Sequence, residues 1–205
     1  MSPEGRLAVF GYASLVDAGS AAATLGREPA EGWPEGAAFA AELVGWQRSW
    51  SQARDNRRCE KTFALDRDGS VPDYVLGLNI ERTGSPHDLV NGLLVPVSEE
   101  ELTRLDVREV RYDRVDVTAE IRPHSLAGEF DAVITYEAKP ENLIVEPPAG
   151  SVILRTYAEA VESAFARLGP GQRLEYLRTT DSQPVDLVDA HLVSDRIPEG
   201  NPRAW

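Results

Sequence analysis

The sequence contains 205 residues, 42% of them hydrophobic and 27% charged, which is enough to bury one sizeable core and argues against a disordered chain. Its 34 acidic and 21 basic side chains give a formal net charge of -13, which disfavours general binding to nucleic acids. With one cysteine, no apolar stretch near the roughly 20 residues that cross a bilayer and no secretion signal, we expect a soluble cytoplasmic protein without an internal disulfide or membrane span.

Short apolar runs in the first half of the chain predict strands. A run at residues 6–12 ends in small residues, and residues 39–50 have a strand-like pattern. Between them, the segment 19–36, rich in Ala, Gly and Pro, predicts a short helix at most and then a loop. Residues 61–65 and 74–80 flank a turn signal of the hairpin type. Several short strands in succession favour a curled sheet or barrel.

The middle of the chain predicts a helix followed by two strands. Ser98 with Glu101 three residues later is the pattern of a capping box at the start of a short helix. Apolar and polar residues then alternate over 114–122, which predicts a half-buried strand. We expect its partner at 130–137, joined to it by a hairpin connection at 127–129.

The last third of the chain predicts helices and then a tail. Apolar residues recur at three- and four-residue spacing over 151–168, and Gly169-Pro170 ends this helix. A shorter helix is predicted at 174–180. We expect residues 181–205 to form an irregular, partly docked tail.

One candidate site is the loop after the first strand, Gly11-Tyr12-Ala13-Ser14-Leu15. Small residues allow a sharp turn that leaves backbone N–H groups unpaired and convergent, which suits a carboxylate or another anion. The alternative is an ordinary strand-to-loop turn. A nucleophilic role for Ser14 is disfavoured, because Tyr12 and Val16 stand where the Gly-x-Ser-x-Gly pattern requires glycine.

A second candidate is Glu109, at the junction between the predicted helix and strand. If this carboxyl group is held beside apolar residues, burial favours its protonated form, which suits a group that takes up a proton and returns it. The alternative is that Glu109 pairs with Arg108 or Arg111 at the surface.

The remaining chemistry-bearing residues point to no further site. Trp46, Arg48 and Trp50 alternate along one strand face and could wall a pocket, although core packing with a snorkelling arginine explains them equally well. The arginine-rich segment 54–58 reads as a solvated loop, and Cys59 reads as a passive thiol. The three histidines, His87, His124 and His191, are far apart in sequence, so a histidine-rich metal centre is not expected. No glycine-rich phosphate-binding loop occurs either, so we expect no nucleotide site.

Taken together, these motifs resemble the γ-glutamylcyclotransferase-like family, which includes AIG2-like and ChaC-related proteins. Residues 9–15 are similar to the family's N-terminal Tyr-Gly-Ser-Leu loop, and residues 91–106 resemble its approach to the active site. Arg108-Glu109 with Tyr112 resembles its catalytic glutamate segment. Further motifs resemble the closing portion of the family: Thr135-Tyr136, the proline-rich loop, Tyr157, Gly171 and Leu174-Glu175-Tyr176. The resemblance therefore covers about residues 7–180.

The resemblance implies an α+β fold, a small mixed β-barrel with flanking helices, and a reaction that converts a γ-glutamyl amine or amino acid to 5-oxoproline without a cofactor or metal. Glu109 would be the catalytic acid/base. The substrate would contact the loop and two tyrosines: Gly11, Tyr12, Ala13, Ser14, Leu15, Tyr112 and Tyr136. A binding or regulatory protein on the same fold and a γ-glutamyl amide hydrolase remain alternatives.

Two features depart from the family pattern. Ala13 stands where the family usually has glycine, and a positive φ at this position would be unfavourable for alanine. Residues 181–205 extend beyond the domain that we predict at 1–180. This extension could cover the pocket or mediate self-association as a homodimer.

Overall fold

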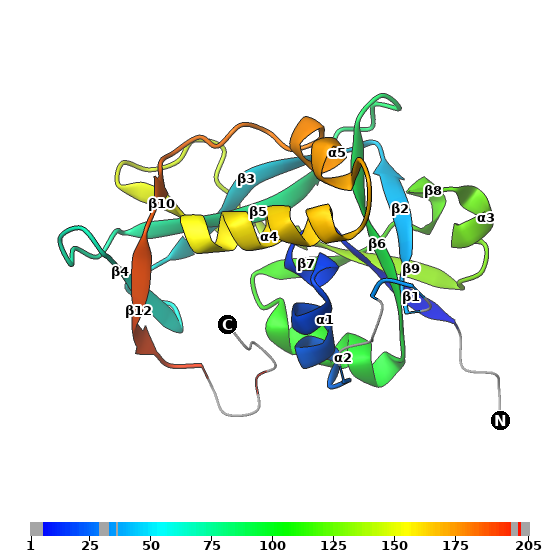
Figure 1. Cartoon of the computed structure of the whole chain (residues 1–205), viewed down its shortest axis with the longest axis horizontal. Helices are drawn as coiled ribbons and strands as arrows, with labels where there is room; N and C mark the ends of the chain where they lie inside the picture. Colours follow the sequence, from blue (N-terminus) through cyan, green and yellow to red (C-terminus); the bar gives the residue numbers. More distant parts are fainter. Residues whose placement is uncertain (1–5, 29–32, 36, 198–200, 202–205) are drawn as a thin grey trace.

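The computed structural model describes residues 6–28, 33–35, 37–197 and 201. It is an α+β fold, with curled, mixed sheets that form a small barrel-like body flanked by helices, as the sequence predicts (Figure 1). The strands of the large sheet run in the order β7-β9-β1-β6-β2-β8, a second sheet has the order β11-β10-β5-β3, and β12 pairs with β4.

The strands are β1 (Leu7–Gly11), β2 (Phe39–Val44), β3 (Trp46–Asp55), β4 (Lys61–Leu65), β5 (Tyr74–Arg82), β6 (Leu89–Val97), β7 (Tyr112–Asp116), β8 (Ile121–Arg122), β9 (Ala132–Ala138), β10 (Ser151–Leu154), β11 (Leu187–Val188) and β12 (Ala190–Asp195). The helices are α1 (Ala18–Leu25), α2 (Glu99–Arg108), α3 (His124–Ala127), α4 (Arg155–Arg167) and α5 (Gln172–Arg178), with short 3-10 turns η1 (Ser14–Val16), η2 (Thr118–Glu120) and η3 (Pro140–Asn142).

Strand β1 lies at the centre of the large sheet, antiparallel to β6 and parallel to β9. Its run Ala8-Val9-Phe10 is buried on both faces, which explains why the sequence is continuously apolar there. Helices α1 and α2 pack against each other, and α4 contacts β10 and η1. The end of β1 therefore leads through η1 into α1, beside α2 and α4 (Figure 1).

The helix predicted after Ser98 is confirmed as α2. The Ser98 side chain accepts a hydrogen bond from the N–H of Glu101, and the Glu101 carboxylate accepts one from the N–H of Ser98. This capping box satisfies two backbone donors that the first turn leaves unpaired. Leu102 and Leu105 are buried on its inner face, as the spacing predicts.

The predicted hairpin between 61–65 and 74–80 is wrong. Both segments are strands, but β4 pairs only with β12 in the described part of the chain, whereas β5 lies between β3 and β10. Both edges of β5 are thus occupied, and the turn at 66–69 reverses the chain without pairing the strands that flank it. The turn chemistry was a local signal, while pairing was decided by segments far away in sequence.

The strand predicted over 114–122 is also wrong in part. Strand β7 ends at Asp116, whose carboxylate accepts a hydrogen bond from the N–H of Thr118 and starts the turn η2. Val117 and Ile121 are both fully buried, so the apolar alternation continues although the ladder does not. The partner strand β9 is confirmed, but α3 occupies the connection where a hairpin was predicted.

The helix predicted over 151–168 begins four residues later. Ser151–Leu154 forms the buried strand β10, parallel to β5 and β11, and α4 starts at Arg155. A short apolar run fits a buried strand and a helix alike, so periodicity does not separate them. The tail at 181–205 was predicted to be irregular, yet it contributes β11 and β12.

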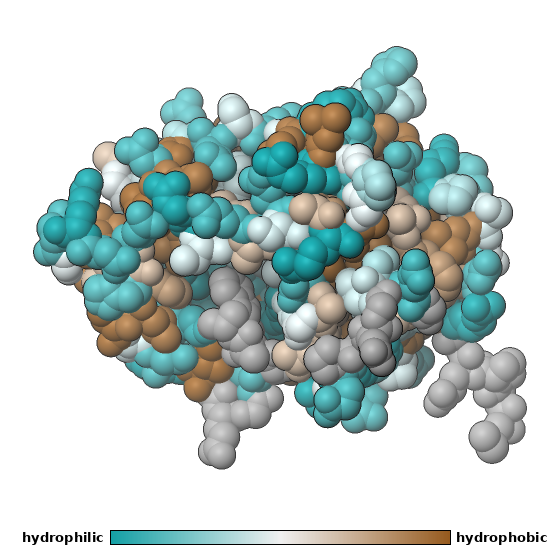
Figure 2. Space-filling view, in the orientation of Figure 1, coloured by the Kyte–Doolittle hydropathy of each residue, from teal (hydrophilic) through white to brown (hydrophobic). Residues whose placement is uncertain are grey.

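Surface apolar side chains lie in separate patches rather than one continuous face (Figure 2). On the face shown, they gather over α5 and beside β4 and β12, where Leu174, Leu177, Leu192 and Val193 are exposed.

Candidate active site

The loop after β1 is held in a sharp turn. A Cβ added at Gly11 would lie 2.9 Å from the Cβ of Leu15, so the chain can fold back at this position only with glycine. The turn η1 then begins at Ser14, with a hydrogen bond from the N–H of Val16 to the carbonyl of Ala13. Within the described part of the chain, the backbone N–H groups of Ala13, Ser14 and Leu15 find no acceptor. They remain available to a ligand.

Ala13 adopts φ -140° and ψ -121°. The family's glycine at this position raised the question of a positive φ, and no non-glycine residue in the described chain has one. Alanine is therefore compatible with the backbone of the loop.

Glu109 caps the C-terminus of α2 and leads into β7. Its N–H donates to the carbonyl of Leu105 (2.7 Å), and its own carbonyl accepts from the N–H of Tyr112 (2.9 Å). This tight exit turns the side chain inward, where it is only 16% exposed, and its Oε1 lies 3.1 Å from Nε of Arg108. Both interpretations of the sequence hold in part, because Glu109 pairs with Arg108 but is largely buried.

The loop and Glu109 line one cavity of about 50 Å³. Every residue that the sequence singled out for the site lines it: Gly11, Tyr12, Ala13, Ser14, Leu15, Glu109, Tyr112 and Tyr136. Within the described residues, Glu109 supplies the only carboxyl group of this lining. The structure thus brings the predicted residues together, while their roles in chemistry stay predictions.

Arg108 connects the loop with Glu109. Its guanidinium is buried and donates to Oγ of Ser14 (2.6 Å), to Oγ of Ser20 (3.2 Å) and to Oγ1 of Thr24. A planar guanidinium with several fixed donors can hold such a set of oxygens in one arrangement. Because the same group pairs with Glu109, the N-terminal loop, α1 and the carboxylate are positioned together.

The phenols around the cavity are committed to hydrogen bonds. Tyr12 donates to the carbonyl of Tyr136 (2.8 Å), Tyr136 donates to Oδ1 of Asp106 (2.9 Å), and Tyr112 donates to the carbonyl of Leu78 (3.0 Å). Burial raises the pKa of Tyr12 well above its usual value. Burial, together with the hydrogen bond to Asp106, raises the pKa of Tyr136. Tyr12 and Tyr136 therefore stay neutral near pH 7 and cannot accept a proton there.

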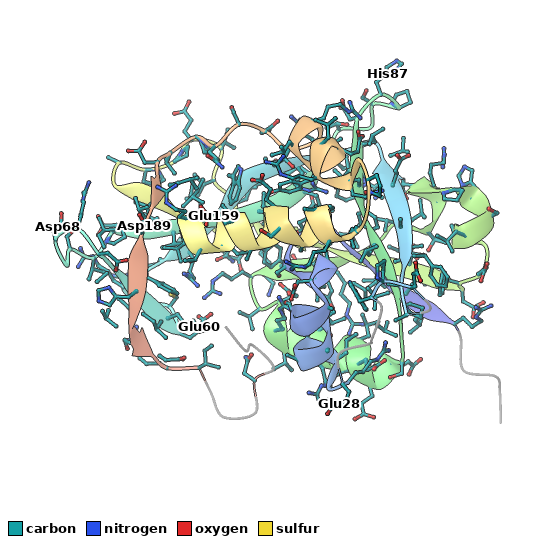
Figure 3. The ribbon with its side chains drawn as sticks, in the orientation of Figure 1. Glu28, Glu60, Asp68, His87, Glu159 and Asp189 are labelled. Atoms are coloured by element: carbon teal, nitrogen blue, oxygen red, sulfur yellow. The ribbon has the colours of Figure 1, made fainter. Side chains whose placement is uncertain are left out.

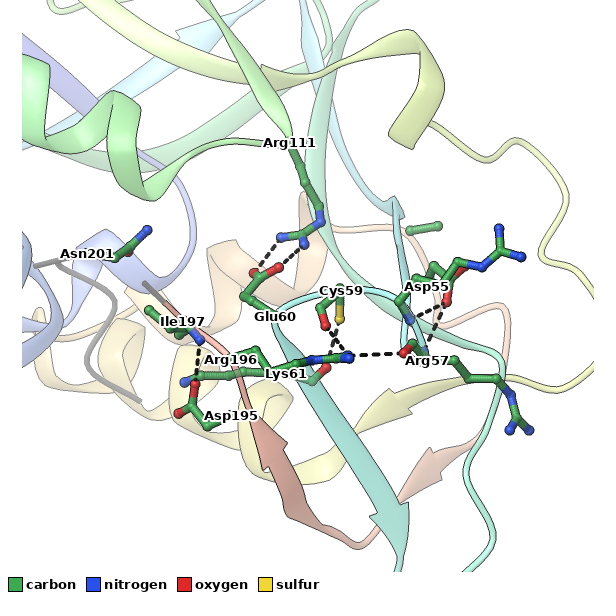
Figure 4. Close-up of polar contacts among 12 residues, drawn as sticks. Asp55, Arg57, Cys59, Glu60, Lys61, Arg111, Asp195, Arg196, Ile197 and Asn201 are labelled. Carbon is green, nitrogen blue, oxygen red and sulfur yellow. Dashed lines mark hydrogen bonds and ion pairs between the residues drawn. The ribbon is translucent and has the colours of Figure 1, made fainter. Parts of the chain in front are cut away.

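A second small cavity, of about 90 Å³, adjoins the first and shares Ser14, Glu109, Tyr112 and Tyr157 with it. It continues past Arg54 and Arg111. Figure 4 shows how Arg111 is held, with two of its nitrogens on the two carboxylate oxygens of Glu60. Among the described residues that line the two cavities, Glu109 is the only one with a carboxylate.

Sequence reasoning did not assign three residues of the cavity lining to the site, Phe10, Leu78 and Tyr157. Leu78 lies in the middle of β5, where its apolar character predicts only core packing. Tyr157 belongs to the apolar stripe of α4. Its phenol hydroxyl, at the start of that stripe, was a weak indication that this end of the helix lines a cavity with polar groups. Burial raises the pKa of Tyr157, so it too is neutral.

Other sequence candidates lie outside the site. Trp46 and Arg48 are fully buried and Trp50 nearly so, and none of the three lines either cavity. Arg48 does not snorkel: it donates to Oγ1 of Thr180 (3.1 Å) and packs over the rings of Phe165 and Tyr176. Its burial lowers the pKa of Arg48 to about 10.

Cys59 donates its thiol hydrogen to the carbonyl of Lys61 (2.7 Å). His87 lies at the tip of the loop between β5 and β6, at the periphery of the molecule (Figure 3). Over the residues that the structure describes, no group of three or more His, Cys, Asp or Glu side chains is placed to hold a metal ion. No described helix has the length and apolar character to cross a membrane.

Comparison with solved structures places the fold, but not the chemistry of the cavity, among known proteins. Solved structures similar to this chain include an uncharacterized human protein (17% identity, TM-score 0.56, 88% of this chain and 90% of that one) and a protein described as a γ-glutamyl cyclotransferase (14%, 0.50, 89% and 93%). The Bacillus subtilis protein YkqA is also similar (15%, 0.51), with 88% of this chain covering 56% of that one. No family model and no curated protein matches the sequence.

These similarities establish the γ-glutamylcyclotransferase-like fold, which the sequence motifs predicted. At 14–17% identity, they say nothing further about the reaction.

Proposed function

We propose that this protein is a γ-glutamylcyclotransferase-type lyase or acyltransferase, which converts a γ-glutamyl amine or γ-glutamyl amino acid to 5-oxoproline and a free amine. The observation that carries the proposal is one cavity lined both by residues 13–15, whose backbone N–H groups have no acceptor in the described chain, and by one largely buried carboxylate, Glu109. The N–H groups supply what an anion or a developing oxyanion requires, and Glu109 supplies proton transfer.

The reaction needs little beyond these N–H groups and the Glu109 carboxyl group. The α-amine and the γ-carbonyl belong to one molecule, so holding a bent conformer can supply roughly 7–11 kcal/mol in favourable cases. The amine nitrogen attacks the γ-carbonyl carbon, and a new C–N bond closes the five-membered ring. The old C–N bond then breaks, and the departing nitrogen takes a proton. The balance requires no cofactor or co-reactant.

In this mechanism Glu109 accepts the proton from the attacking amine and returns it to the leaving amine. Its contact with the Arg108 guanidinium (3.1 Å) holds the carboxyl group in place at the cavity wall. The neutral phenols of Tyr12 and Tyr136 shape the pocket, and their hydrogen bonds to the protein fix their orientation. The backbone N–H groups at 13–15 bind the α-carboxylate or polarise the carbonyl.

The direct test is to incubate the protein with γ-glutamyl-alanine and with glutathione and to measure products by mass spectrometry. Release of 5-oxoproline is expected. Free glutamate would instead support the amide hydrolase. Binding of 5-oxoproline without any turnover would favour a ligand-binding or regulatory protein on this fold.

Glu109→Gln tests the proton-transfer role. We expect it to retain the fold and much of the affinity for 5-oxoproline, because the amide preserves the shape of the side chain. It should lose about 10²-fold or more in kcat, since an amide cannot exchange the proton. Glu100→Gln, on the exposed face of the same helix, is the matched control and should behave as wild type. Undiminished activity in Glu109→Gln would remove this residue from the mechanism.

A further inference from the structure

A third and larger hollow, of about 500 Å³, lies between α1 and α4 and opens beside the candidate active site. Its walls are mostly apolar and come from β4, β10 and α4: Phe63, Leu154, Tyr157, Ala160 and Val161. We refer to it as the apolar hollow. The proposed chemistry at Glu109 does not use it.

The apolar hollow adjoins the site. Ser14 and Tyr157 line all three cavities, and Leu154 is shared between the hollow and the cavity that continues past Glu109. A substrate whose glutamyl part occupies the loop cavity must send its leaving amine past Glu109, because that carboxylate protonates the departing nitrogen. The hollow shares Ser14, Leu154 and Tyr157 with the cavity that runs past Glu109, so it lies beside the group attached to this nitrogen.

The charges of the hollow exclude a strongly polar occupant. Asp17 is the only charged residue in its described lining. Its carboxylate accepts hydrogen bonds from the N–H of Ser20 (2.9 Å) and from Nη2 of Arg167 (2.6 Å), so it is already compensated. The described lining therefore offers no cation to a carboxylate on the leaving group, and burying such a charge there would be unfavourable.

On the basis of the proposed function, we propose that the preferred substrate is a γ-glutamyl amide whose amine carries an uncharged alkyl or aromatic group, and that the apolar hollow binds this group. Removing an apolar group from water into such a site is favourable in proportion to the area buried. The hollow thus makes the chain selective for an apolar γ-glutamyl amine over a small or charged one.

The test compares two substrates that differ only in the amine, γ-glutamyl-2-phenylethylamine and γ-glutamyl-methylamine, with 5-oxoproline release as the readout. For the wild-type protein we expect kcat/KM to be at least about tenfold higher for the phenylethyl substrate. Equal values would overturn the proposed specificity and leave the proposed function intact. Absence of 5-oxoproline from both substrates would refute the function itself.

Two variants of α4 locate the effect. Ala160→Trp fills the hollow from an exposed position outside the glutamyl cavity, and should abolish the phenylethyl preference while turnover of the methylamide stays as in wild type. Ala166→Trp places the same bulk at an exposed position of the same helix that does not line the hollow, and should retain the preference. A preference that survives in Ala160→Trp would overturn the assignment of the hollow.

Discussion

The hydroxyl of Ser14 accepts a hydrogen bond from a buried guanidinium, and this geometry bears on its chemistry. Nη2 of Arg108 lies 2.6 Å from its oxygen, whereas a nucleophilic serine needs a base that accepts its proton. The hydroxyl thus anchors the loop through Arg108. The loop's own contribution to binding comes from backbone groups, which a change of side chain preserves.

Ser14→Ala should therefore affect stability more than turnover. We expect kcat for 5-oxoproline release to stay within the same order of magnitude, because the N–H groups of the loop remain. The free energy of unfolding should fall by about 1.5 kcal/mol, since Arg108 loses one charged hydrogen bond and keeps those to Ser20 and Thr24. Urea denaturation and product assays measure the two quantities. Near-total inactivation of a folded Ser14→Ala protein would point to hydroxyl chemistry instead.

Residue types near the site carried much of the information that the sequence could give. Glycine and small residues after an apolar run predicted the loop, and a lone glutamate at a helix end predicted the acid. Arg48 shows the limit of such reasoning. Its alternation with two tryptophans placed it on a buried face, but its partners are distant in sequence: Asn91 is 43 residues away, and Thr180 and the aromatic rings are more than a hundred.

At the scale of elements, β6 packs against the end of β1, where the loop begins. Gly92 of β6 lies against the end of β1, and a Cβ at this position would be 2.4 Å from the carbonyl oxygen of Gly11 and 2.7 Å from Cζ of Phe10. The first of these contacts is with backbone, which cannot rotate away. The strand must therefore carry glycine at this position for the loop to keep its conformation.

Gly92→Ala should destabilise the protein by about 1–3 kcal/mol, as overpacking of a core does, and should also raise KM because the end of β1 is displaced. Urea denaturation and substrate kinetics provide the two measurements. Gly128→Ala is the matched control. Its φ is -65°, and the nearest atom to the new Cβ is the carbonyl oxygen of His124 at 3.4 Å, so little change is expected. Equal stability of the two variants would contradict the packing argument.

Elements were predictable where the determining contacts are local. The capping box of α2 involves residues three apart, and its start was correct. The boundary between β10 and α4 was not, because the buried run Ser151–Leu154 becomes a strand only through β5 and β11 on either side. Strand β4 was found from its composition, but its partner β12 lies about 125 residues further along the chain.

At the scale of the molecule, the last part of the chain joins regions that are far apart in sequence. Strand β12 pairs antiparallel with β4, and Arg196, directly after it, lies beside Cys59 and Lys61 (Figure 4). Nη2 of Arg196 donates to the carbonyls of Arg57 (3.1 Å) and Cys59 (2.7 Å), and Asn201 donates to the carbonyl of Val107 on α2 (3.1 Å). The tail thereby links β4, which walls the apolar hollow, with the helix that presents Glu109.

Removal of residues 186–205 should consequently lower the free energy of unfolding of the whole protein. Strand β4 would lose its described partner and expose an open edge, which also favours aggregation. We expect the loss to be a large fraction of the ~5–15 kcal/mol that stabilises an ordinary domain. Arg196→Ala removes only the two side-chain hydrogen bonds and should cost about 1 kcal/mol. Urea midpoints of the three proteins measure this order, and a truncated protein as stable as wild type would show instead that the segment is a dispensable appendage.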